Sequence, residues 1–132
     1  MTRRMARCMA AAALLGAAAT GCSASDEEDA VRAAAEALFG AVRAGDGARA
    51  CASLVPRAVE GLESPEAPCR EQVLKVGLEG GPVGRVEVWS GQARARAGSD
   101  TVFLVRWGDG WRVTAAGCER KPGEPYDCEV DA

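Results

Sequence analysis

The hydrophobic pattern of this chain changes its period once, at the glycine- and proline-rich stretch 77–82. Before this stretch, apolar residues recur at the three- and four-residue spacing of helices, whereas afterwards they alternate with polar residues, as in strands. A single change of this kind predicts an α+β fold in which helices come first and then pack on an antiparallel sheet. The 132 residues are enough for one domain.

The helical part predicts three main helices. Ser25 and Glu28 form a capping box at the start of the first helix. Gly45 is expected to end this helix, and Asp46 to cap a short second helix over 47–54. Pro56 ends that helix, and a helical continuation follows it. Ser64, ahead of Pro65, predicts the start of a third helix. The apolar face of the first helix consists of Val31, Ala35, Leu38 and Val42.

The second part predicts two hairpins and a last edge segment near 126–130. Strands 86–90 and 93–97 flank a type II′ turn at Gly91-Gln92. This register places Val88 opposite Ala95, Glu87 opposite Arg96, and Trp89 opposite Arg94. Strands 102–107 and 111–116 flank a three-residue loop with Gly110 in the left-handed region, which places Trp107 opposite Trp111. Phe103, Trp107 and Trp111 would then share one face of the sheet.

Residues 1–21 have the pattern of a cleaved signal peptide. Arg3, Arg4 and Arg7 precede an apolar stretch, 8–19, that is shorter than the roughly 20 residues needed to span a bilayer. Without these three arginines, 13 of the 16 basic residues remain against 19 acidic ones, a net charge of −6. An acidic protein of this kind is not expected to bind nucleic acid, nor to hold anionic lipid through a basic patch.

The segment Ala19-Thr20-Gly21-Cys22 resembles the lipobox of bacterial lipoproteins, with Ala19 where leucine is usual. The resemblance implies cleavage before Cys22, a diacylglycerol thioether on its sulfur, a tether over 22–27 and a domain over 28–132. The protein would then sit on the extracytoplasmic face of the cell membrane. An ordinary cut after Ala24, which releases a soluble protein, is the alternative. General secretory and twin-arginine export both stay open.

The leader and the lipobox determine which cysteines can pair. Cys8 leaves with the leader and Cys22 carries lipid, so four of the six cysteines remain in an oxidising environment. Of the three connectivities, we favour Cys51–Cys69 with Cys118–Cys128, because each closes a short loop. The chain has no Cys-x-x-Cys spacing and no histidine, which argues against a metal site and removes the commonest general base. We therefore predict no catalytic residue and no cofactor.

The order of helices and strands, with Phe39, Gly45-Asp46 and Gly110-Trp111-Arg112-Val113, resembles the nuclear-transport-factor-two-like superfamily, in particular its SnoaL-like and lipoprotein members. The resemblance covers roughly 28–118 and is one of topology. It implies a curved, cone-like sheet of about four strands over the helices, often with a pocket and often dimeric. Enzymes of the superfamily place Asp, His or Tyr in that pocket. The single tyrosine, Tyr126, lies outside the matching region, so no catalytic residue can be carried over.

Two surfaces are candidates for a site. Phe103, Trp107 and Trp111 would line a pocket at the mouth of the cone, or simply pack in the core. Trp89 with Arg94, on the opposite face, would contact a partner or a second copy, or be an ordinary exposed aromatic. The first functional hypothesis is a non-catalytic module that binds a small ligand or an envelope protein. The alternatives are a SnoaL-like isomerase or hydrolase using carboxylates only, and a purely structural envelope protein.

Overall fold

A computed structural model describes residues 21–123 and 125–132. Helices come first and a five-stranded antiparallel sheet follows, in the order β1-β2-β3-β4-β5. The sheet is open, with β1 and β5 at its edges, so the α+β class is confirmed while closure into a cone is not seen. The elements are α1 (Gly21–Arg43), α2 (Gly47–Ala52), α3 (Pro56–Leu62), α4 (Cys69–Gln72), β1 (Val83–Trp89), β2 (Gln92–Ala97), β3 (Asp100–Trp107), β4 (Gly110–Glu119) and β5 (Asp127–Val130).

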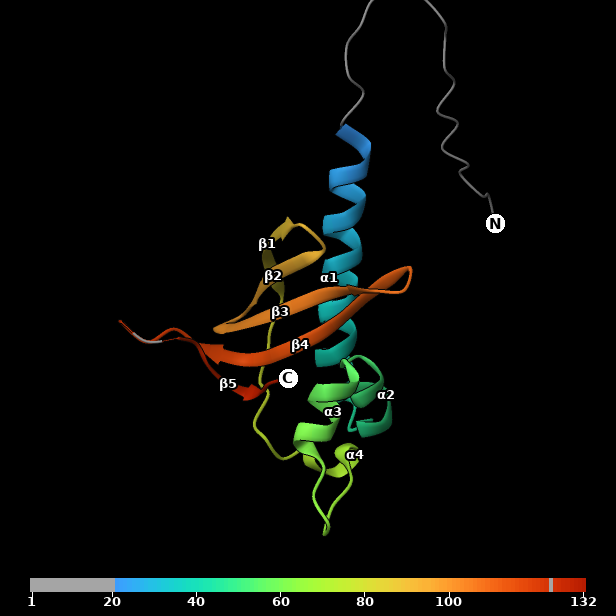
Figure 1. Ribbon diagram of the computed structural model, residues 1–132, viewed down its shortest axis with the longest axis vertical. Helices are drawn as coiled ribbons and strands as arrows, with labels where there is room; N and C mark the ends of the chain where they lie inside the picture. The colour runs from blue at the N-terminus through green and yellow to red at the C-terminus, as the bar shows by residue number, and fades with distance from the viewer. Residues whose placement is uncertain (1–20, 124) are drawn as a thin grey trace, which may run out of the picture.

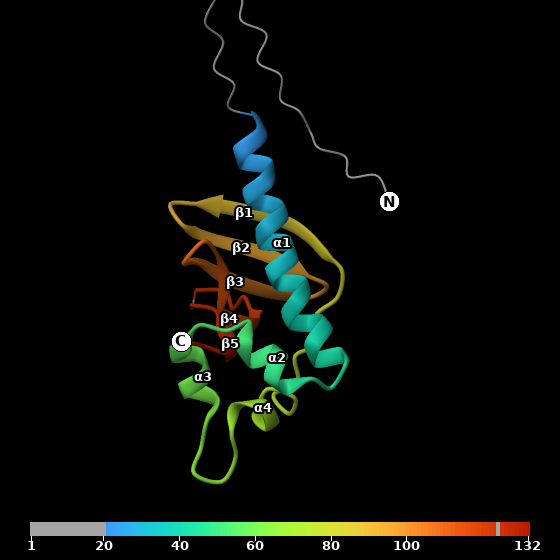
Figure 2. The same ribbon diagram turned by 90° about the vertical axis from the view of Figure 1, so that its right-hand side faces the viewer.

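Helix α1 runs along one face of the sheet, and the short helices gather near its C-terminal end (Figures 1 and 2). The side chains that face the sheet are buried, as the helical periodicity predicts: Val31, Ala35, Leu38 and Phe39. The first turns of α1 project beyond the sheet, and residues 24–26 are exposed. None of the helices that the structure describes is both long enough and apolar enough to cross a bilayer.

The capping box predicted at Ser25 is wrong, because α1 begins at Gly21. Between residues 22 and 39 the chain has neither proline nor glycine, so nothing interrupts the backbone hydrogen bonds and the helix extends toward the N-terminus. Residues 22–27, expected to form a tether, are therefore helical. The other leader residues, 1–20, lie outside the part of the chain that the structure describes.

The junction between α1 and α2 follows the prediction. Gly45 has a φ of 69°, and its N–H donates to the carbonyl of Val42 at 3.0 Å while Asp46 N–H donates to Ala41 at 2.9 Å. This pair of hydrogen bonds is a Schellman motif. The Asp46 carboxylate then accepts a hydrogen bond from the N–H of Arg49 at 3.1 Å and caps α2.

The third predicted helix is shorter than expected. Ser64 accepts a hydrogen bond from the N–H of Ala67 through its hydroxyl at 3.1 Å, and the two residues also pair through their backbones. The helix α4 starts only at Cys69, after Pro68 in an extended conformation. The reason is steric, since a proline disfavours the helical region for the residue before it. Helical structure after Pro56 is confirmed as α3.

The first hairpin is shifted by two residues from its predicted register. The loop is Ser90-Gly91, with φ values of 46° and 74°, which is typical of a type I′ turn. Val86 therefore faces Ala95, Glu87 faces Arg94, and Trp89 faces Gln92. A shift of two keeps every side chain on its predicted face, because side chains alternate with a period of two.

The second hairpin is shifted by one residue near its turn, and this changes the faces. The loop is Gly108-Asp109 with Gly108 at φ 60°, so Trp107 pairs with Gly110 and Arg106 with Trp111. Phe103 still pairs with Ala115, because a bulge between Phe103 and Leu104 restores the predicted pairing. Leu104 and Val113, rather than the predicted aromatic residues, point into the core.

Both predicted disulfides are present. Cys51–Cys69 joins α2 to α4, and Cys118–Cys128 joins facing residues of β4 and β5. Each closes a short loop, with sequence separations of 18 and 10. The first holds the short helices together and the second holds the last strand on the sheet, where a small core alone gives limited stability.

The alanines of β2 limit how large a side chain can be between the sheet and α1. Ala93, Ala95 and Ala97 are at most 1% exposed and belong to the buried core. We expect Ala95→Val to destabilise the protein by about 1–3 kcal/mol through overpacking. The matched control is Arg96→Val, which introduces the same residue at the exposed neighbouring position and should cost less than 1 kcal/mol. Chemical denaturation of both variants measures this difference, and equal losses would contradict the packing argument.

Candidate functional site

Among the residues that the structure describes, no helix covers one face of the sheet, and polar and aromatic side chains gather on this face. We call this the outer face, because side chains alternate and the neighbours of the buried β2 alanines point away from α1. Glu87 of β1, Arg94 of β2 and Phe103 of β3 are consecutive partners across the strands. A salt bridge and an aromatic ring thus stand side by side on this face.

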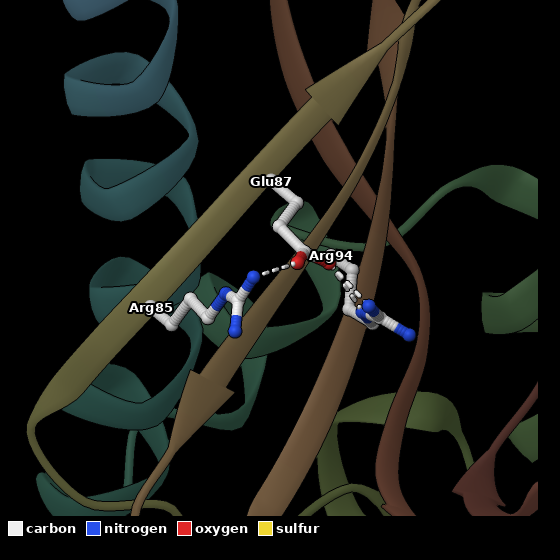
Figure 3. A network of polar contacts seen from close by, with 3 residues as sticks. All are labelled: Arg85, Glu87 and Arg94. Atoms are coloured by element: carbon white, nitrogen blue, oxygen red, sulfur yellow. Dashed lines mark hydrogen bonds and ion pairs between the residues drawn. The ribbon is translucent and has the colours of Figure 1, made fainter.

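Glu87 is the centre of a small ionic network (Figure 3). Its carboxylate accepts a hydrogen bond from Nε of Arg94 at 3.0 Å and also contacts a terminal nitrogen of that guanidinium. Arg85 approaches the second carboxylate oxygen at 2.9 Å. The hydrogen bond from Arg94 lowers the pKa of Glu87, against the opposing effect of desolvation, and the same contact raises the pKa of Arg94.

This network lies in a groove with a volume of about 630 Å³. Its floor includes the buried residues Thr101 and Cys118, which are 4% and 1% exposed. Two glutamates, Glu87 and Glu119, also line it. We call this the arginine groove, because four arginines line it: Arg85, Arg94, Arg96 and Arg120.

A second hollow of about 470 Å³ adjoins the groove on the outer face. Tyr126 lines both cavities. Its ring meets the ring of Phe103 edge to face, with 5.1 Å between centroids. Tyr126 lies two residues before Cys128, so the Cys118–Cys128 disulfide keeps it close to the sheet. We call this the aromatic hollow; its lining includes Trp89, Phe103, Val105, Ala115 and Tyr126.

The structure separates the three aromatic residues predicted to share a pocket. Phe103 lines the aromatic hollow, but on the outer face. Trp107 is 44% exposed and stacks with Arg112, whose guanidinium carbon is 5.5 Å from the ring centroid. Trp111 packs against the core cluster, under Arg106 at 5.1 Å. The one-residue shift of the hairpin explains the separation, since it turns Trp107 and Trp111 to opposite faces.

The predicted pair of Trp89 and Arg94 is also separated. Trp89 is 44% exposed at the end of β1, where it borders the aromatic hollow. Arg94 turns to Glu87 instead, because the observed register makes these two residues direct partners. The sequence placed Glu87 opposite Arg96, an arginine that would also form a salt pair, but the partner across the hairpin is Arg94.

Sequence reasoning missed the arginine groove. The alternation Ala93-Arg94-Ala95-Arg96-Ala97 carried a signal, since it places two arginines on the face opposite the buried alanines. Arg85, Arg120 and Tyr126 had no such signal, because their place depends on the pairing of β1 and on the segment after β4. Of the predicted lipidation site, Cys22, the structure describes only the backbone, in the first turn of α1.

Within the described residues, no group of three or more His, Cys, Asp or Glu side chains is arranged to hold a metal ion. Comparison of the chain with protein-family models, with curated proteins and with solved structures gave no match.

The lowered pKa of Glu87 predicts an acid-dependent contribution to stability. A carboxyl group whose pKa is lower in the folded than in the unfolded protein stabilises the folded state at pH values above its ordinary pKa of 4.5. This stabilisation is lost as the pH falls through the lower, folded-state pKa. We expect Glu87→Gln to lower Tm at pH 7 and to have a smaller effect with each step below pH 4.5. Thermal unfolding between pH 7 and pH 3 measures this trend.

Glu60→Gln, on α3, is the matched control, because Glu60 is exposed and lies outside the groove. Its effect on Tm should be small across the same pH range. A Glu87→Gln effect that stays constant down to pH 3 would show that the loss of stability does not come from the charge of Glu87.

Proposed function

We propose that this protein is a non-catalytic binding module, held by lipid on Cys22 at the extracytoplasmic face of a bacterial cell membrane, and that it binds its ligand on the outer face of the sheet. The observation that carries the binding part is a pair of cavities that share Tyr126, on the sheet face that no helix of the described residues covers. Together they offer charged, aromatic and apolar contacts to one molecule.

The covered inner face supports this choice of site. Its side chains, which are small on β2 and larger on β3 and β4, are packed in the buried core under α1. The outer face, in contrast, combines a buried floor with arginine and aromatic side chains, which are the residue types that bind most strongly at recognition sites. Two fixed points support its shape: the paired strands, and the disulfide that holds β5.

The anchor rests on the leader and on the resemblance of 19–22 to a lipobox. The projecting first turns of α1 fit such an anchor, because they would act as a helical spacer. From Cys22 to Val31, which is fully buried, nine residues at 1.5 Å each give about 14 Å. The domain would stand that far from the lipid and leave the outer face open to solutes.

The anchor predicts a specific covalent form. The intact mass of protein extracted from membranes should correspond to a chain that starts at Cys22, carries a diacylglycerol group and has both disulfides closed. Cys22→Ala should move the protein from the membrane fraction to the soluble fraction. Cys8→Ala is the control and should leave it in the membrane. A soluble species that starts at Ser25 would contradict the anchor.

The binding site predicts where ligands perturb the molecule. In a fragment screen followed by amide NMR shifts, the hits should perturb residues that line the two cavities, such as Arg94, Phe103 and Thr101. Amides of α2 and α3 should remain unperturbed and are the internal control. Hits that cluster on the helices would refute an outer-face site, whereas a hit that is converted to a product would favour the alternative, a SnoaL-like pocket enzyme using carboxylates.

A further inference from the structure

We infer that the ligand of the outer face is an amphiphile with an anionic head: the head, a phosphate or a carboxylate, lies in the arginine groove, and the apolar body lies in the aromatic hollow. This inference rests on the proposed function and names the ligand class of the same site. The positive charge of the arginine groove supports the anionic head, and the position of Tyr126 between the two cavities supports the apolar body.

The arginine groove carries more positive than negative charge, although the chain as a whole is acidic. Four arginines face two glutamates there, whereas the whole chain has a formal net charge of −3. Arg85 and Arg94 share Glu87. Among the described residues, neither Arg96 nor Arg120 has a carboxylate within 4.0 Å. Their guanidinium groups are therefore the ones that an incoming anion meets.

The Glu87 contact also prepares Arg94 for a ligand. Glu87 occupies Nε and one terminal nitrogen of this guanidinium. Figure 3 shows the other terminal nitrogen directed away from Glu87. A guanidinium held in one orientation loses less side-chain entropy when it binds an anion, and its planar donors match the geometry of phosphate and carboxylate groups. Glu87 is thus a positioning residue. Tyr126 is a second polar neighbour of the Arg94 guanidinium and lines the same groove, so a head group at Arg94 would meet both side chains.

The aromatic hollow supplies the apolar contacts next to this charge. Arg94 and Phe103 are direct partners on β2 and β3, so the charged and aromatic parts meet at one strand pair. Tyr126 borders both cavities, with its ring against Phe103. Thr101, which pairs with Arg96, lies two residues before Phe103 on β3, a distance of about 7 Å along the strand. A head group beside Arg96 would place the following apolar chain over Phe103 and toward Trp89.

The test compares three probes by isothermal titration calorimetry, with the full exported chain carrying Cys22→Ala. Dodecyl phosphate below its micelle concentration has both head and chain, inorganic phosphate has the head alone, and dodecyl maltoside has the chain with a neutral head. We expect dodecyl phosphate to bind at least tenfold more tightly than either of the others. Equal binding of dodecyl maltoside would overturn the anionic head, and equal binding of inorganic phosphate would overturn the amphiphile.

Substitutions assign the two parts of the ligand to the two cavities. Arg96→Gln and Arg120→Gln, both at exposed positions, should each weaken dodecyl phosphate binding about fivefold or more. Arg57→Gln, an exposed arginine of α3 outside the groove, is the matched control and should change nothing. Phe103→Ala should weaken dodecyl phosphate and leave inorganic phosphate unchanged, which separates a lost chain contact from a misfolded groove.

The failure of this inference can be told apart from the failure of the proposed function. If neutral fragments perturb the outer face while dodecyl phosphate binds no better than dodecyl maltoside, the binding module stands and the anionic ligand class is wrong. If Arg96→Gln and Arg120→Gln bind dodecyl phosphate like the parent protein, the head group does not lie in the arginine groove. If no probe binds and fragments perturb only the helices, both proposals fail.

Discussion

The packing of α1 on the alanines of β2 determines how the rest of the molecule is arranged. Ala93, Ala95 and Ala97 are buried, and the helix covers them with Val31, Ala35, Leu38 and Phe39. Small residues on β2 leave room for the larger side chains of the helix, so the two layers pack closely. All the arginines of β2 then have to lie on the other face, because side chains in a strand alternate.

The outer face is the consequence of this arrangement. No helix in the described part of the chain covers it, and its positive charges are balanced only in part by Glu87. The last strand and Tyr126 complete it from the far end of the sequence, held by the Cys118–Cys128 disulfide. The site therefore combines residues from all five strands and from the segment that precedes β5. An arrangement that depends on the pairing of five strands cannot be built from any local motif.

This explains which parts of the structure the sequence predicted. Hydrophobic periodicity and cysteine spacing predicted the helices, the change to strands and both disulfides, because these features depend on local geometry or on short loops. The positions of the two hairpin loops were predicted wrongly. Ser90-Gly91 formed the loop in place of Gly91-Gln92, and Gly108-Asp109 formed a two-residue loop, so the two registers shifted by two residues and by one. Only the one-residue shift moved side chains to the other face, and it separated Trp107 from Trp111.

The start of α1 gives the molecule a further property. The helix that forms the inner layer of the domain continues without a break to Gly21, and residues 22–39 contain neither glycine nor proline. A continuous helix of this length bends only slightly, so it transmits direction as well as distance. The backbone of Cys22 thus keeps a nearly fixed position and direction relative to the sheet.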